Sequence, residues 1–221
     1  MTTVQIGRAG SSDTRVLADL LGEACHSLAP ARWLVLNPTQ RALILPAYLR
    51  IHLEHAMTFG EVHLTADRSA VAVWFHHDRP LPEPASYPTR LALACGQWAD
   101  RFRALEAFLT SRHPPWPHHY LALLAVRPDR QGQGRASALL RHHHAHLDEH
   151  GIPAYLQACS QRARDLSQRH GYQLCGEPLT LPSSAPMWPM WRQPVPPATP
   201  PPHATESWLS QAGASATMQI R

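Results

Sequence analysis

The glycine-rich turn at 126–137 is the part of this sequence whose residue types and spacing best indicate chemistry. The apolar run 119–126 (HYLALLAV) predicts a buried strand, Pro128 follows it, and Gly132 and Gly134 directly precede an amphipathic segment that predicts a helix. Such a turn directs free backbone N–H groups and the positive helix end at one point, and glycine permits close approach. The spacing therefore predicts a phosphate or pyrophosphate site. The alternative is a tight connection that binds nothing, because the third glycine of the dinucleotide fingerprint is missing.

All 20 side chains counted as Lys or Arg are arginines, because the 221-residue chain contains no lysine. This absence excludes Schiff-base lysine chemistry, the phosphate-loop lysine and the kinase-type strand lysine. Arg130 and Arg135 are then the side chains beside the turn that can add positive charge near a bound anion. The arginines are scattered along the chain, so no nucleic-acid-binding surface is predicted.

The cysteines and the N-terminus indicate the compartment. The four cysteines lie far apart without a CxxC pair, which predicts free thiols and neither a disulfide framework nor a zinc site. The first residues, MTTVQIGRAG, lack the pattern of a signal peptide, and no apolar run is long enough for a transmembrane helix. We therefore expect a cytoplasmic protein with no membrane partner.

Hydrophobic periodicity predicts the helices and strands that must position the turn. The expected strands are 4–6, 61–66, 70–75, 119–126, 154–158, 172–180 and 187–193, with the second and third forming an antiparallel hairpin. The expected helices are one capped by Ser12 or Asp13, one from Pro38 to about Thr58 that Pro46 kinks or splits, one at 89–110, one from the glycine turn to about Glu149, and one at 162–170. Proline-rich composition predicts a surface loop at 78–88 and a disordered tail at 194–221, after a domain at 1–193.

The region around the turn resembles the acyl-CoA-binding motif of the GNAT N-acetyltransferase superfamily. The matching residues are Val126-Arg-Pro128, then Gln131-Gly132-Gln133-Gly134-Arg135-Ala136, at the end of a strand and the start of a helix. The segment 152–172 (IPAYLQACSQRARDLSQRHGY) is similar to the strand, short helix and closing Gly-aromatic pair of the superfamily. Among subgroups the chain looks most like the puromycin N-acetyltransferases, through SAVAVWF (69–75), GIPAYLQAC and LPSSAPMWPMWR (181–192).

This resemblance implies an α+β fold with a central mixed, largely antiparallel sheet, flanked by helices on both faces. The sheet is splayed where the strand ending at Val126 parts from the strand 154–158. It also implies that acetyl-CoA lies in this cleft and that its acetyl group passes directly to the amine of a small molecule, without a metal, in a monomer or homodimer. The residues implied for cofactor binding are Leu124, Ala125, Val126, Arg130, Gln131, Gly132, Gln133, Gly134, Arg135, Ala136, Ser137 and Ser160.

The proton donor of the family is the point at which this sequence departs from the pattern. The family commonly has a tyrosine four residues before the closing glycine, and that position is Ser167 here. Ser167 donates to the CoA thiolate through water, or Tyr172 or Cys159 approaches the sulfur, or the protein is a weak or non-catalytic, regulatory acyl-CoA-binding module. In the simplest alternative Ser167 is an ordinary polar residue on an exposed helix face.

A general base is sought among side chains that can face the acceptor side of the cleft, where histidine has a suitable pKa. The candidates are Glu54, His52, His76, His77, His118 and His119, and a chain of water molecules is the alternative to all of them. We select Ser167, Glu54 and His119 as the catalytic candidates.

The run RHHHAHLDEH (141–150) invites a metal-site interpretation. His142 and His146 are four residues apart, as two ligands on one helix face must be, and Glu149 is close by. However, the core-facing side of the expected helix is formed by Leu139, Leu140, His143 and Leu147. His142, His146 and Glu149 then lie on its flank. We therefore expect a solvated helix flank and no metal.

Overall fold

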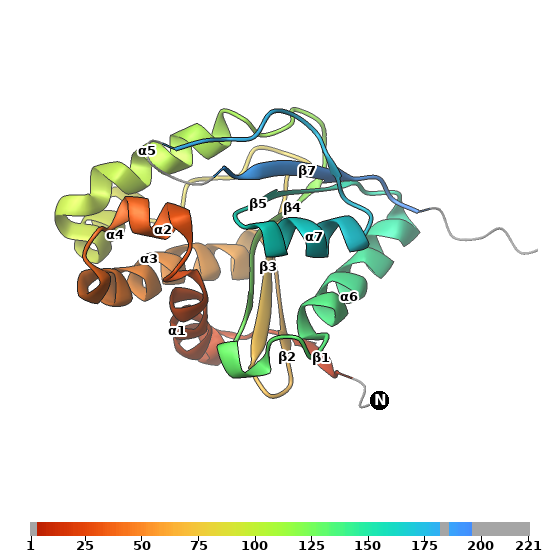
Figure 1. The fold of residues 1–221 in the computed structure, drawn as a ribbon, viewed down its shortest axis with the longest axis horizontal. Coiled ribbons are helices and arrows are strands. Elements are labelled where there is room, and N and C mark those ends of the chain that lie inside the picture. Colours follow the sequence, from red (N-terminus) through yellow and green to blue (C-terminus); the bar gives the residue numbers. More distant parts are fainter. Residues whose placement is uncertain (1–3, 182–185, 196–221) are drawn as a thin grey trace, which may run out of the picture.

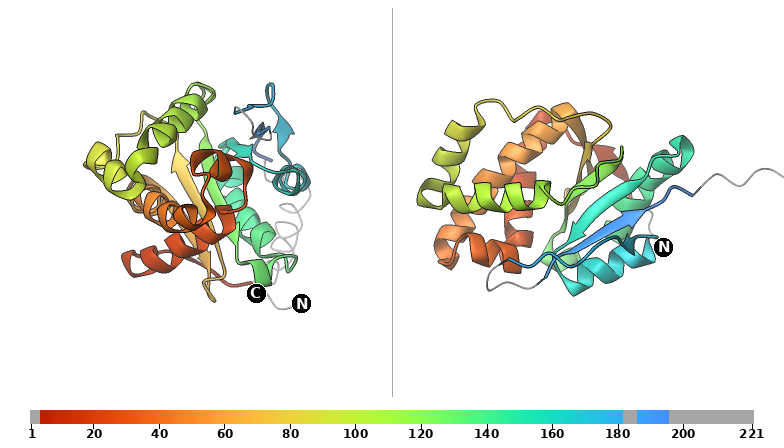
Figure 2. Two further views of the ribbon diagram at one scale, coloured as in Figure 1. Left: turned by 60° about the vertical axis from the view of Figure 1, so that its left-hand side comes forward. Right: turned by 90° about the horizontal axis from the view of Figure 1, so that it is seen from above.

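A seven-stranded sheet in the order β1-β2-β3-β4-β5-β7-β6 runs through the molecule, with helices on both faces (Figures 1 and 2). The computed structural model describes residues 4–181 and 186–195. Its strands are β1 (Ile6–Arg8), β2 (Gly60–Thr65), β3 (Ala70–His76), β4 (His119–Val126), β5 (Ala154–Ala158), β6 (Gln173–Leu174) and β7 (Trp188–Arg192). Its α-helices are α1 (Thr14–Cys25), α2 (Ala29–Leu34), α3 (Pro38–Phe59), α4 (Tyr87–Cys95), α5 (Ala99–Thr110), α6 (Arg135–His150) and α7 (Gln161–Arg169).

The sheet is mixed and largely antiparallel, which confirms the expected fold class. Among the described strands, β4 and β5 form the one parallel pair, and each other pair is antiparallel. The hairpin prediction is also confirmed, because β2 and β3 pair directly in antiparallel register. The expected tail lies outside the described residues from 196 onward.

Both faces of the sheet are covered, which explains why β3 is apolar along its whole length. Val71, Val73 and Phe75 pack with helices α1 to α5 on one face, whereas Ala70, Ala72 and Trp74 pack with α6 on the other. Both faces of β2 are buried as well. His63 and Thr65 are as buried as their neighbours, because α6 lies over them.

Several element boundaries differ from the sequence predictions. The single helix expected at 89–110 is wrong: α4 ends at Cys95, and a 3-10 turn at Gly96–Trp98 precedes α5. Gly96 has a φ of +50°, a left-handed conformation that stops an α-helix. Pro46 does not split α3, which is continuous over Pro38–Phe59. The strand expected at 172–180 is reduced to β6, and α2 was not predicted.

Helices α1 and α3 cross closely at Gly22. A Cβ atom added there would lie 2.5 Å from Cγ of Pro46, well inside van der Waals contact. We expect Gly22→Ala to destabilise the protein by about 1–3 kcal/mol through overpacking, although alanine is the better helix former by about 1 kcal/mol. Urea denaturation followed by circular dichroism measures this free energy.

The control is a double-mutant cycle with Pro46→Ala, which removes the ring that the new methyl group meets. The two substitutions should then be less damaging together than their separate effects predict. A Gly22→Ala protein as stable as the wild type would show that the helices separate at little cost.

In the described part of the chain, the helices are too short or too polar to cross a lipid bilayer.

Candidate functional site

The strands β4 and β5 separate in the middle of the sheet. They pair only at His119↔Ala154, Tyr120↔Tyr155 and Leu121↔Leu156, and then diverge. The separation begins at a β-bulge, because β4 has one extra residue, Ala122, between the residues that pair with Trp74 and Val73 of β3. A bulge bends its strand and interrupts pairing. The splayed sheet implied by the sequence is therefore present, and its cause is a local insertion that the sequence analysis did not identify.

Beyond the bulge, β4 has an unpaired edge that faces the gap. The Arg127 N–H donates to the Ser69 carbonyl on the β3 side at 2.8 Å. Because backbone groups alternate in direction along a strand, Ala125 also faces β3, whereas Leu124 and Val126 face the gap. Of the three strand residues predicted to bind the cofactor, two thus direct backbone groups into the gap. The Val126 carbonyl accepts a hydrogen bond from the Gln131 side-chain amide at 3.2 Å.

The glycine turn connects this edge to α6. Gly132 and Gly134 have φ values of +76° and +78°, and a Cβ atom at either position would contact nothing within 4 Å. The Ala138 N–H donates to the Gly134 carbonyl at 2.9 Å and begins the helical ladder. The N–H groups of the three preceding residues, 135–137, consequently have no helical acceptor. Free donors, a positive helix end and open space above two glycines together form an anion-binding geometry.

The arginines of the turn are engaged with neighbouring side chains. Arg135 donates to Asp67 Oδ2 at 2.8 Å and to Ser69 Oγ at 2.6 Å, in the β2–β3 turn. Hydrogen bonds from Arg135 and from Ser69 hold the pKa of the Asp67 carboxyl well below its usual range. The Arg135 side chain therefore braces the turn from behind and is already paired. Arg130 is exposed and lies 3.5 Å from Asp129.

A cation from α7 also reaches the turn. Arg162 Nη1 donates to Gln131 Oε1 at 2.5 Å and so connects the first turn of α7 to the glycine turn. The sequence analysis missed this residue, although its place at the start of the short helix was a usable signal. The hydroxyls of Ser160 and Ser137 have partners: Ser160 Oγ accepts the Ala163 N–H at 3.2 Å, and Ser137 Oγ lies 3.0 Å from His170 Nε2.

Ser167 is buried, with 4% of its surface exposed, so the alternative of an exposed polar residue is wrong. Its hydroxyl donates to the Ala163 carbonyl one turn earlier in α7, at 2.8 Å. Tyr172 is also buried, and its hydroxyl lies 3.0 Å from His144 Nε2 on the α6 face of the sheet. Both hydroxyls thus already have hydrogen-bond partners.

A different phenol lies where the strands part. The Tyr120 hydroxyl of β4 donates at 3.1 Å to Oε1 of Gln157, the first β5 residue beyond the paired segment. Burial and the nearby Cys159 thiol raise the pKa of Tyr120, so the phenol is protonated at neutral pH. Burial also raises the pKa of Cys159 to about 11. The sequence analysis did not select Tyr120, because the bulge that places it at the parting point was not predicted.

Glu54, on α3, is held by two arginines. Its carboxylate accepts hydrogen bonds from Arg50 at 2.7 Å and from Arg90 of α4. Burial acts to raise the pKa of Glu54, but the two arginines prevail and lower it. A carboxylate with a lowered pKa and two cationic partners is a weak proton acceptor. His52, also on α3, lies 3.2 Å from Glu106 Oε1.

His119 belongs to a partly buried network of side chains on the α6 face. We call Glu61, His63, His76, His119 and His143 the Glu61 network. His119 Nδ1 lies 3.0 Å from His143 Nε2, and the His63 and His76 rings lie 3.0 and 3.3 Å from the Glu61 carboxylate. Burial lowers the pKa of His119 to about 4. His119 is therefore neutral at pH 7. Because only 6% of the residue is exposed, a proton from the amine would reach its ring through the neighbouring side chains.

The buried and exposed sides of α6 are those predicted from the sequence. Leu139, Leu140, His143 and Leu147 are buried, whereas His142, His146 and Glu149 are exposed. Among the residues that the structure describes, these last three do not converge as a group of metal ligands. The four cysteines are free thiols, as predicted.

Comparisons with known proteins agree with this geometry. The model of the acetyltransferase (GNAT) family matches residues 64–172. A structure from Corynebacterium glutamicum, described as histone acetyltransferase HPA2 and related acetyltransferase, is 27% identical with a TM-score of 0.66, and covers 90% of this chain and 100% of that chain. Arylalkylamine N-acetyltransferase 2 from Aedes aegypti (12% identity, TM-score 0.58, covering 87% and 99%) and an agmatine N-acetyltransferase (18%, 0.57, covering 87% and 100%) share the fold. The parted strands, the glycine turn and the structural neighbours together show the GNAT fold, and residues 64–172 match the model of the acetyltransferase (GNAT) family.

Proposed function

We propose that this protein transfers an acetyl group from acetyl-CoA directly to the amine of a small molecule. The observation that carries the proposal is the continuous path from the glycine turn along the free edge of β4 to the bulge at Ala122. The pyrophosphate binds the N–H groups of 132–137, the pantetheine arm follows Leu124 and Val126, and the thioester ends beside the parting point. The match to the acetyltransferase (GNAT) family model supports acetyl transfer as the reaction. The agmatine and arylalkylamine enzymes that share the fold support a small amine as the acceptor.

The reaction requires a polarised thioester carbonyl, a proton for the departing thiolate and an acceptor for the proton of the amine. A neutral amine attacks the thioester carbonyl carbon, the new C–N bond forms as the C–S bond breaks, and the departing thiolate takes up a proton. Backbone N–H groups at the parting point polarise the carbonyl oxygen. The amine gives up its proton to a base or to water.

Tyr120 is our candidate donor of the thiolate proton, because its phenol is protonated and adjoins the parting point. Tyr120→Phe should lower kcat by about 100-fold, the usual contribution of general acid catalysis, and should leave acetyl-CoA affinity unchanged. Release of free CoA thiol in the presence of a panel of amines measures kcat, and calorimetry measures the affinity.

Tyr155→Phe is the matched control. Tyr155 is paired with Tyr120 in the sheet and bonded to the same glutamine, but its hydroxyl also points toward the Arg112 carbonyl, away from the gap. Equal losses in both variants would assign the effect to the hydrogen-bond network and not to proton donation.

The second candidate function is a non-catalytic acyl-CoA-binding module. It is favoured by Ser167, which the sequence resemblance assigns to the position of the family's tyrosine, and whose hydroxyl is bonded to its own helix. Tight binding of acetyl-CoA with no thiol release on any amine of the panel would support this second function and contradict the first.

A further inference from the structure

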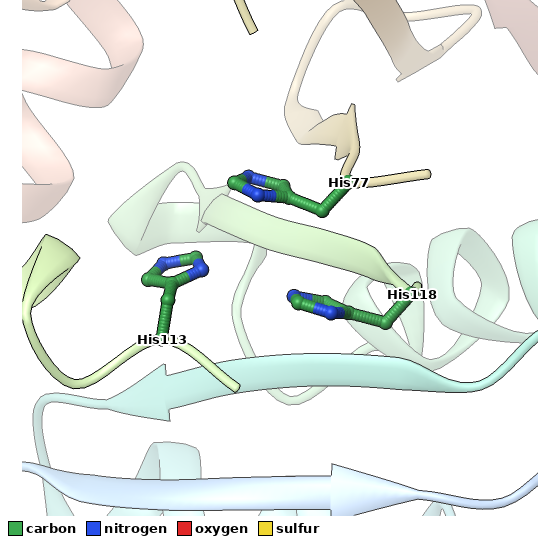
Figure 3. A group of neighbouring side chains, drawn as sticks. All are labelled: His77, His113 and His118. Carbon is green, nitrogen blue, oxygen red and sulfur yellow. The ribbon is translucent and has the colours of Figure 1, made fainter. Parts of the chain in front are cut away.

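Three histidines from separate segments converge at the end of the sheet remote from the glycine turn (Figure 3). His77 follows β3, His113 lies in the connection between α5 and β4, and His118 directly precedes β4. We call them the three-histidine cluster. Each offers one ring nitrogen, and these three atoms all lie within 4.8 Å of one another. The arrangement is unrelated to the His142 and His146 pair that the sequence suggested.

The backbone holds the cluster in place. The His77 N–H donates to the His118 carbonyl at 2.8 Å, which ties the end of β3 to the start of β4. The His113 N–H donates to the Thr110 carbonyl at 3.1 Å, at the end of α5. The rings therefore face one another because of the fold, with centroids of His77 4.7 and 5.1 Å from those of His113 and His118.

His118 has the hydrogen-bonding pattern of a metal ligand. Its Nδ1–H donates to the Trp116 carbonyl at 2.6 Å, which leaves the lone pair on Nε2. The residue is 1% exposed, and in the described part of the chain Nε2 is buried without a hydrogen-bond partner. A ligating histidine ordinarily donates its other N–H to a carbonyl or carboxylate in this way. His113 Nδ1 is likewise buried without a partner among the described residues.

The surroundings keep the imidazoles neutral and shield one side from water. Burial, with the neighbouring histidines, lowers the pKa of His77 to about 4 and that of His113 to about 3. The rings of Tyr120 and Tyr155 cover the cluster, 4.4 and 5.1 Å from His113 by centroid. The Asp78 carboxylate, next to His77, adds a negative charge.

A second group of three, Glu61, His63 and His143, has equally close ligand atoms. It differs in that His63 already bonds to the Glu61 carboxylate at 3.0 Å, although His63 Nδ1 and His143 Nδ1 are also buried without a partner among the described residues. The three-histidine cluster has no such internal partner in the described residues, and its buried nitrogens are unmet.

We propose that His77, His113 and His118 bind one divalent transition-metal ion of the zinc type, with a water molecule in the fourth position. Three imidazoles and one open position are a known zinc ligand set, with Zn–N distances of about 2.0–2.1 Å. The rings of His77 and His118 are stacked with an interplanar angle of 7°, so binding requires the rings to turn until their nitrogens point at one ion. The ion fastens the connection between α5 and β4 to the end of β3.

The test is titration of the untagged, metal-stripped full chain with Zn²⁺ by calorimetry, and with Co²⁺ by visible absorption. We expect one ion per chain, the intense Co²⁺ bands of a tetrahedral site, and a higher Tm in the presence of Zn²⁺. His113→Asn, in a half-buried loop position, should weaken the affinity by at least the roughly 10–100-fold that loss of a second-shell partner causes. His77→Asn should do the same, and provides a second variant if the first fails to fold.

The control is the double variant His142→Ala/His146→Ala, which removes two exposed histidines and leaves the cluster intact. It should bind Zn²⁺ as the wild type does. The proposal is overturned if the wild type binds no Zn²⁺, if both asparagine variants bind it with unchanged affinity, or if the control variant loses it.

Discussion

Substituting Gly134 by alanine should weaken acetyl-CoA binding by about 10–100-fold. Gly134 precedes α6 with a φ of +78°, and the space around its missing Cβ is open. In the proposed function this is the space that the pyrophosphate occupies, so a methyl group displaces phosphate from the N–H groups of the helix end. A hydrogen bond to a charged group is worth about 1.5–3 kcal/mol, and loss of one such bond corresponds to the expected change. Isothermal titration with acetyl-CoA measures the affinity.

Gly151→Ala is a closely matched control. Gly151 follows the other end of the same helix, has a φ of +66° and also has nothing within 4 Å of an added Cβ. The two variants carry similar backbone strain, roughly 1–2 kcal/mol, and should lose similar stability. Only Gly134→Ala should lose affinity. Equal affinities in the two variants would mean that the turn does not hold the cofactor.

The glycine turn was predictable because its signals are local. A largely apolar strand of eight residues, a proline, two glycines and an amphipathic helix follow one another in sequence, and each residue type suits the conformation it adopts. The hairpin of β2 and β3 was predictable for the same reason. By contrast, the break between α4 and α5 depends on the left-handed Gly96, and a glycine within an amphipathic segment does not by itself end a helix.

The features that shape the site beyond the turn depend on contacts between distant residues. The bulge at Ala122 lies within a uniformly apolar strand, and only the register against β3 reveals it. Arg135 donates a hydrogen bond to Asp67 of the hairpin, which lies far from it in the sequence. The side chains of the three-histidine cluster come from three separate segments. No spacing rule for a single helix or strand indicates such groupings.

Two adjacent buried histidines of α6 should make the protein unstable in mild acid. His143 and His144 are 1% and 5% exposed, and burial lowers their pKa values to about 2 and about 3. Below pH 6.5 the unfolded chain binds protons at both rings while the folded chain does not. The free energy of unfolding therefore falls as the pH falls, by up to about 1.4 kcal/mol per pH unit for each histidine.

Between pH 6.5 and 4.5 this loss reaches at most about 5 kcal/mol, comparable with the whole stability of a marginal domain. Glu61 does not offset it, because hydrogen bonds from His63 and His76 hold its pKa low and its contribution is lost only below the unfolded value. Urea denaturation at stepped pH, with a chelator present, should show the decline. His144→Gln keeps a hydrogen-bonding group opposite the Tyr172 hydroxyl and should make the slope shallower by up to about 1.4 kcal/mol per pH unit, the contribution of one histidine. His150→Gln, at the exposed end of the same helix, should leave it unchanged. A stability that stays constant down to pH 4.5 would show that these rings are protonated within the folded protein, and that α6 opens to water without unfolding.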